Sequence, residues 1–101
     1  MDTLLVSPVA LREMMRRRGF SVRKLADAVE ARLIRDFREG DPKPTCSKST
    51  ISNLCSGSSR VCRADRAAAI ESILGIEDFK MFRPVIRADK WFIEHTRREV
   101  A

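Results

Sequence analysis

The stretch Ser47-Lys-Ser-Thr-Ile-Ser-Asn-Leu-Cys-Ser-Gly57 reads as a short helix with both of its ends marked. Ser47 suits the N-cap position, because its hydroxyl can accept a hydrogen bond from a free backbone N–H of the first turn. Gly57 suits the stop, because glycine adopts the left-handed conformation at little cost. Only Ile51 and Leu54 are large and apolar, so one thin stripe faces a core. The opposite face carries small hydrogen-bonding groups, which suits the major groove of DNA better than a protein interior.

Similar signals predict helices on either side of this one. Ser7-Pro8 and Gly19 mark a helix over about 8–18. Ser21 begins another, whose apolar residues recur at helical spacing as far as Gly40; this pattern predicts either one helix over about 22–38 or two in close succession. Two prolines make 40–44 a loop. A last helix is predicted over 64–74, ending at Gly75. Its expected packing face consists of Ala67, Ala68, Ile70, Ile73 and Leu74.

The last quarter of the chain holds most of the aromatic residues and follows no single pattern. It is too apolar for a disordered linker, and an extended arm, a short strand pair and a helix near 89–98 all remain open. Phe79 and Phe82 are expected to pack on the helices, whereas Trp91 and Phe92 belong either to that packing or to a dimer or partner contact. The expected organisation is a domain at 1–76, with an insertion at about 31–45, and a C-terminal arm at 77–101.

Composition indicates a basic protein, which favours an anionic partner but leaves open a soluble protein that is basic without one. The 101 residues include 20 Lys and Arg against 14 Asp and Glu, a net charge of +6 and a pI near 9.9. Such a balance favours nucleic acid or an anionic membrane surface. No apolar run is long enough to span a bilayer, and the N-terminus lacks the features of a signal peptide. A cytoplasmic location without membrane contact is therefore expected, and positive charge brackets the helix at 48–55.

The cysteines and the single histidine give little support to a metal or catalytic site. Cys46, Cys55, Cys62 and His95 lack the close Cys pairs of the common zinc sites, so reduced thiols are expected instead. A redox pair of Cys46 and Cys62 stays an open alternative. No glycine-rich phosphate loop or nucleophile motif is present. We therefore expect no enzyme, no cofactor, no metal and no small-molecule substrate.

Taken in order, these elements resemble the Cro and lambda-repressor type of helix-turn-helix protein, also called the XRE family. The matching pieces are Arg18-Gly19, Ser21-Val-Arg-Lys-Leu-Ala26, Ser47-Lys-Ser-Thr-Ile-Ser52 with Gly57, and Ala67 to Ile76, so the resemblance covers roughly residues 8–76. The expected fold is all-α: a four- or five-helix bundle with an extended second helix and loop, and a C-terminal aromatic appendage. The chain departs from the family where Ala31 to Thr45 replaces a short glycine turn.

The resemblance also implies which residues meet DNA. The positions that usually face base edges are Lys48, Ser49 and Asn53, with Ser52 at their margin. Lysine suits guanine and asparagine suits adenine in the major groove. The positions expected at phosphates are Ser47, Ser58, Ser59, Arg60, Arg23 and Lys24. Phosphate contacts would dominate the affinity and make it salt-sensitive, and base contacts would supply discrimination.

The function expected from the resemblance is sequence-specific binding of double-stranded DNA by a transcriptional regulator. A phage or prophage repressor or a Cro-like protein would occupy an operator, commonly as a homodimer on two half-sites. Two alternatives remain. One is a DNA-binding antitoxin that holds a protein partner through the apolar tail, and the other is a helix-bundle interaction protein without specific DNA binding.

Overall fold

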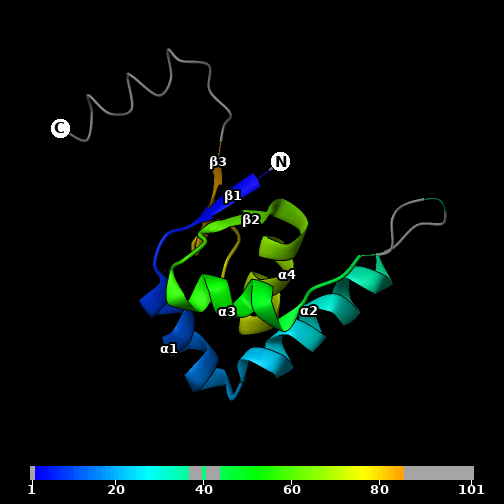
Figure 1. Cartoon of the computed structure of the whole chain (residues 1–101). Coiled ribbons are helices and arrows are strands. Elements are labelled where there is room, and N and C mark those ends of the chain that lie inside the picture. Colours follow the sequence, from blue (N-terminus) through cyan, green and yellow to red (C-terminus); the bar gives the residue numbers. More distant parts are fainter. Residues whose placement is uncertain (1, 37–39, 41–43, 86–101) are drawn as a thin grey trace, which may run out of the picture.

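The computed structural model describes residues 2–36, 40 and 44–85, and it combines helices with a small sheet (Figure 1). The elements in chain order are β1 (Asp2–Leu5), α1 (Pro8–Arg18), α2 (Val22–Arg35), α3 (Lys48–Ser56), β2 (Val61–Arg63), α4 (Ala64–Leu74) and β3 (Phe82–Val85). The expectation of an all-α bundle is therefore wrong. The three strands form an antiparallel sheet at one end of the molecule, and the helices lie beneath it.

The sheet joins three segments that are far apart in the sequence. Its strand order is β2-β1-β3, and Thr3 at its centre lies opposite Cys62 on one side and Pro84 on the other. The hydroxyl of Thr3 donates a hydrogen bond to the Cys62 carbonyl at 2.8 Å. Thr3 and Leu5 point into the core, and Leu4 between them is exposed. Strands of three or four residues are too short to show this alternation clearly in the sequence. For this reason the prediction of an all-α fold did not include them.

The helix ends follow the local signals closely. α1 and α4 have the predicted bounds, and α3 extends one residue beyond the predicted 55. The hydroxyls of Ser7 and Ser21 each accept from the backbone N–H three residues on, both at 3.1 Å. The stop glycines all have positive φ, as the left-handed cap requires: Gly19, Gly57 and Gly75.

α2 is one continuous helix that ends earlier than predicted. It runs to Arg35, with Asp36 as its C-cap, instead of reaching residue 38. Residues 37–39 and 41–43 lie outside the described residues, so the loop predicted at 40–44 is described only at Gly40 and Pro44. Of the two predictions for this stretch, one long helix and two helices in succession, the structure has the single helix. Its apolar pattern stays useful as far as the last turn, where Leu33 is buried.

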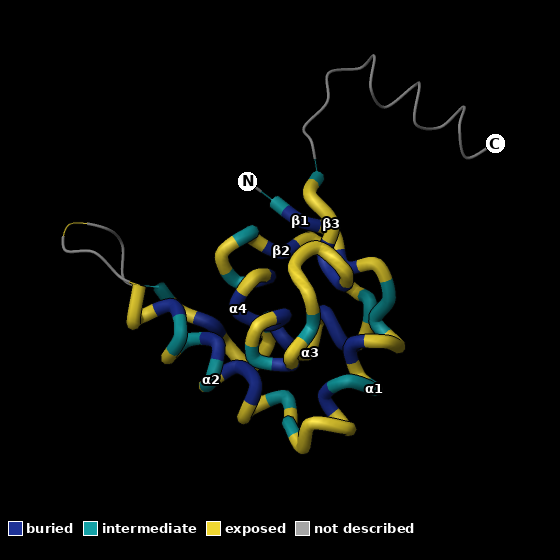
Figure 2. The backbone as a smooth tube through the Cα atoms, turned by 180° about the vertical axis from the view of Figure 1, so that it is seen from behind, coloured by how far each residue is buried: buried dark blue, intermediate teal, exposed yellow. Residues whose placement is uncertain are grey.

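The core lies between the helices and the inner face of the sheet. Its fully buried side chains come from every layer, and Figure 2 shows buried segments of the helices turned inward. α4 contacts both α2 and the sheet, so its buried face differs from the predicted one. Ala68 is exposed and Ile73 is half-buried, whereas Ala69 and Glu71 are buried. Two-sided packing widens the buried stripe beyond the single face that helical spacing predicts.

The chain after α4 is held to the helix by a buried carboxyl group. Glu71 is 2% exposed and accepts hydrogen bonds from the backbone N–H groups of Phe79, Met81 and Phe82 at 3.3, 3.1 and 3.2 Å. Phe82 is completely buried, as expected, and Ile76 packs against the core. The expectation for Phe79 is wrong, because it is 55% exposed.

The segment 77–85 therefore belongs partly to the sheet of the helical unit, since β3 pairs with β1. The helix considered near 89–98 and the residues Trp91 and Phe92 lie outside the described residues. Within the described part of the chain, no helix has the length and hydrophobicity that crossing a bilayer requires.

Candidate nucleic-acid interface

α3 is anchored along one side only. It packs on α1 and α2 and lies between them (Figure 1). Its buried residues are Ile51, Leu54 and Cys55, which matches the thin apolar stripe read from the sequence together with the small buried thiol beside it. The Cys55 thiol donates to the sulfur of Met15 in α1 at 3.5 Å. The face of α3 opposite this stripe is left to solvent.

The exposed face of α3 carries all four residues that the resemblance places at base edges: Lys48, Ser49, Ser52 and Asn53. Positions four apart lie one above the other on a helix, so Lys48 and Ser52 form one row and Ser49 and Asn53 form the next. The two rows present an ammonium group, two hydroxyls and an amide together. These are the group types that read the edges of base pairs in the major groove.

Ser47 caps the N-terminus of α3, as the sequence predicted. Its hydroxyl accepts from the Thr50 N–H at 3.2 Å and lies 3.0 Å from the Thr50 hydroxyl. The first N–H groups of a helix have no partner within the helix, and this end of the helix attracts anions. A phosphate at this end would therefore meet backbone N–H groups as well as the exposed Ser47 side chain.

The C-terminus of α3 is closed by a small hydroxyl network. The Ser56 and Ser58 hydroxyls lie 2.8 Å apart, and Ser56 donates to the Asn53 carbonyl at 3.2 Å. Ser59 donates its N–H to the same carbonyl at 3.3 Å. Ser58 approaches the side-chain oxygen of Asn53 at 3.4 Å, at the long limit for such a bond. This weak contact leaves the Asn53 amide group able to exchange its partner for a base edge.

Arg12 of α1 also holds α3, and the sequence did not predict this contact. Its guanidinium donates to the carbonyl of Cys55 in the last turn of α3 and so ties that turn to α1. A cation is favourable at this end of a helix, where carbonyl oxygens lack partners. The two residues are 43 positions apart, so no local pattern could have paired them. This hydrogen bond adds to the packing that holds α3 on α1.

Four exposed cations lie on α3, in the first turn of α2 and shortly after α3. Arg23, Lys24, Lys48 and Arg60 are exposed, and within the described residues none of them forms an ion pair. They are the basic residues that the resemblance places at DNA.

Three other arginines have an acidic neighbour. In α1, Arg16 and Arg17 lie 2.6 and 3.1 Å from the carboxyl group of Glu13, and their hydrogen bonds lower the pKa of Glu13 to about 2. Arg63 lies 3.7 Å from Asp65. The exposed cations on and beside α3, like several others among the described residues, form no ion pair and keep their charge for an outside anion.

The cysteines are free thiols enclosed by the core. Burial raises the pKa of Cys46 and Cys55, and it raises that of Cys62 to about 12. A thiol with a raised pKa is a poor nucleophile and a poor metal ligand near neutral pH, because both roles need the thiolate. Among the described residues, which exclude His95, no cluster of side chains suited to a metal ion is found. The proposed Cys46–Cys62 redox pair stays a hypothesis.

Comparison of the chain with protein families, with curated proteins and with solved structures finds no match.

Proposed function

We propose that the protein binds double-stranded DNA sequence-specifically, with α3 as the helix that enters the major groove. The observation that carries the proposal is the division of α3 into a thin buried stripe and an exposed face of Lys48, Ser49, Ser52 and Asn53. A helix that contributes so little to the core, yet is capped at both ends and tied to α1, is held rigidly for an outside partner. Such rigidity favours recognition of one base sequence over another.

Exposed cations near α3 support the expected contacts with DNA phosphates. Arg23 and Lys24 lie in the first turn of α2, and Arg60 follows α3, all exposed. Each phosphate neutralised by such a cation contributes about −0.9 to the slope of log affinity against log salt concentration. These cations would position the protein on the duplex, and the α3 face would choose the sequence. As a transcriptional regulator, such a protein would act by occupying an operator and excluding polymerase.

Selection from a random DNA library at physiological salt, followed by sequencing, tests the proposal directly. We expect an enriched motif, and inverted half-sites would indicate a symmetric dimer. Binding that yields no motif and disappears as salt rises would reject sequence reading by α3.

Substitutions then assign the contacts, with affinity measured by fluorescence anisotropy on the selected motif. Lys48→Ala and Asn53→Ala are each expected to weaken binding by about 1–3 kcal/mol for a good base contact. Lys80→Ala is the matched control for loss of one exposed lysine, because Lys80 follows α4 in the chain and lies outside the α3 face. If Lys48→Ala and Lys80→Ala weaken binding equally, the loss is a general effect of charge, and Lys48 does not contact a base.

A further inference from the structure

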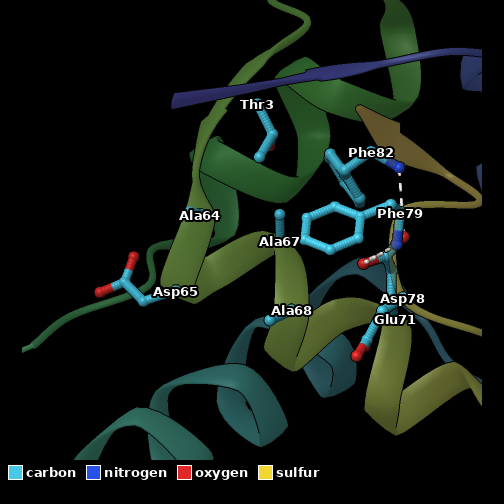
Figure 3. Close-up of a pocket in the computed structure, with 9 residues that line it drawn as sticks. All are labelled: Thr3, Ala64, Asp65, Ala67, Ala68, Glu71, Asp78, Phe79 and Phe82. Carbon is cyan, nitrogen blue, oxygen red and sulfur yellow. Dashed lines mark hydrogen bonds between the residues drawn. The ribbon is translucent and has the colours of Figure 1, made fainter. Parts of the chain in front are cut away.

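A cavity of about 300 Å³ lies between α4 and the sheet, outside the α3 face (Figure 3). Ala64, Ala67 and Ala68 line it from α4, and Thr3 and Phe82 line it from the sheet. The small alanine side chains leave the space open beside the ring of Phe82. The volume lies at the lower limit of small-molecule pockets, roughly 300–1,000 Å³, and suits one or two large side chains.

Phe79 marks the edge of this cavity and is held in an unusual state. Its φ is +64°, which makes it the one non-glycine residue with positive φ in the described part of the chain. A bulky residue in the left-handed region carries strain of about 1–2 kcal/mol, and this ring is also 55% exposed. The hydrogen bond from its N–H to Glu71 helps to hold the residue there. The Phe79 ring is exposed beside an apolar cavity, so a further apolar group could fill the cavity and cover the ring.

The rim of the cavity is acidic, unlike the surroundings of α3. Asp65 and Asp78 are both exposed beside it. Arg63 lies 3.7 Å from Asp65, whereas Asp78 forms no ion pair within the described residues. From residue 67 to residue 79 the chain contains no basic residue. This charge disfavours a phosphate backbone and favours an aromatic group accompanied by a cation.

The chain itself carries such a segment immediately after the described residues. Lys90-Trp91-Phe92-Ile93 combines a cation with three large apolar side chains. Phe82 of the cavity and Val85, the last described residue, are three strand residues apart, about 10 Å. The six residues from Val85 to Trp91 span up to about 20 Å when extended. The chain can therefore turn back after β3 and bring Trp91 to the cavity.

We propose that the cavity between α4 and the sheet is the docking site for the chain's own segment 90–93, with an aromatic side chain of this segment inserted beside Phe79 and Phe82. The proposal does not depend on DNA binding. It gives the exposed ring of Phe79 a partner and places Lys90 at the acidic rim.

Trp91 is a specific probe, because it is the only tryptophan in a chain that has no tyrosine. In the full chain we expect its fluorescence to be blue-shifted and protected from acrylamide, compared with the urea-unfolded chain. Ala68→Arg fills the cavity from an exposed position, and it is expected to move both signals to their unfolded values while far-UV circular dichroism stays unchanged. Ser72→Arg adds the same side chain elsewhere on the exposed surface of α4 and is expected to change neither signal.

A second pair of variants keeps the test decisive if Ala68→Arg does not fold. Asp78→Arg reverses the charge of the rim and is expected to expose Trp91, whereas Glu77→Arg, one residue away and outside the cavity lining, is expected to leave it protected. The proposal fails if Trp91 in the folded wild-type chain is as exposed as in urea, or if the cavity variants behave as their controls. It also fails if protection is lost on dilution together with a halving of the mass in light scattering, because the segment would then come from a second copy.

Discussion

Replacing Glu71 by alanine is expected to unfold much of the sheet end of the molecule. The carboxyl group accepts from three backbone N–H groups, and those of Met81 and Phe82 are buried. A buried donor left without an acceptor costs about 1–3 kcal/mol, so the two together cost about 2–6 kcal/mol. The Phe79 N–H is nearer the surface, where water can replace the lost acceptor. This loss is a large part of the roughly 5–15 kcal/mol by which small proteins are stable.

Urea unfolding followed by far-UV circular dichroism measures this effect on the free energy of unfolding. Glu71→Gln keeps one acceptor oxygen in nearly the same shape, so we expect it to cost less than Glu71→Ala. Glu77→Ala is the matched control, because Glu77 is exposed six residues further on and should change stability by no more than about 0.5 kcal/mol. If Glu71→Ala unfolds within that same margin of the wild type, the carboxyl group does not hold the chain after α4 and the reasoning is wrong.

Three further predictions concern contacts between distant segments. Thr3→Val keeps the shape but removes the donor to the Cys62 carbonyl, and a cost of about 1–3 kcal/mol is expected in urea unfolding; an unchanged midpoint would contradict it. Because the folded pKa of Cys62 is about 12 against an ordinary 9.0, its thiol stays protonated where the unfolded chain loses the proton. Stability should therefore fall as pH rises from 9.0 toward 12, and Cys62→Ala should show a smaller fall; an equal fall would exclude this cause. Arg12→Met removes the guanidinium from the Cys55 carbonyl, and hydrogen exchange of the last-turn amides of α3 should accelerate; unchanged exchange would mean that Arg12 does not hold α3.

The candidate interface was predictable where it depends on local chemistry. Ser47 and Gly57 mark the ends of α3, and the spacing of Ile51 and Leu54 decides which face is buried. The complementary face then follows from helix geometry alone. What local chemistry could not give is the restraint on the helix. The contact of Arg12 crosses 43 residues, and nothing in the sequence near either residue distinguishes this arginine from its neighbours.

The sequence by itself determined where the helices lie and most of their ends, because a cap or a stop acts on the backbone within three or four residues of itself. The C-terminal end of α2, predicted near residue 38 and found at Arg35, is the exception. Only the tertiary structure decided the sheet, because its strands are short and Thr3 finds its partner 59 residues away. It also decided that Glu71 is buried and Phe79 exposed, the reverse of what their chemistry alone suggests. Both outcomes have one cause: the chain after α4 turns so that β3 pairs with β1. That turn brings the N–H groups of the chain to Glu71 and leaves Phe79 at the surface, 55% exposed.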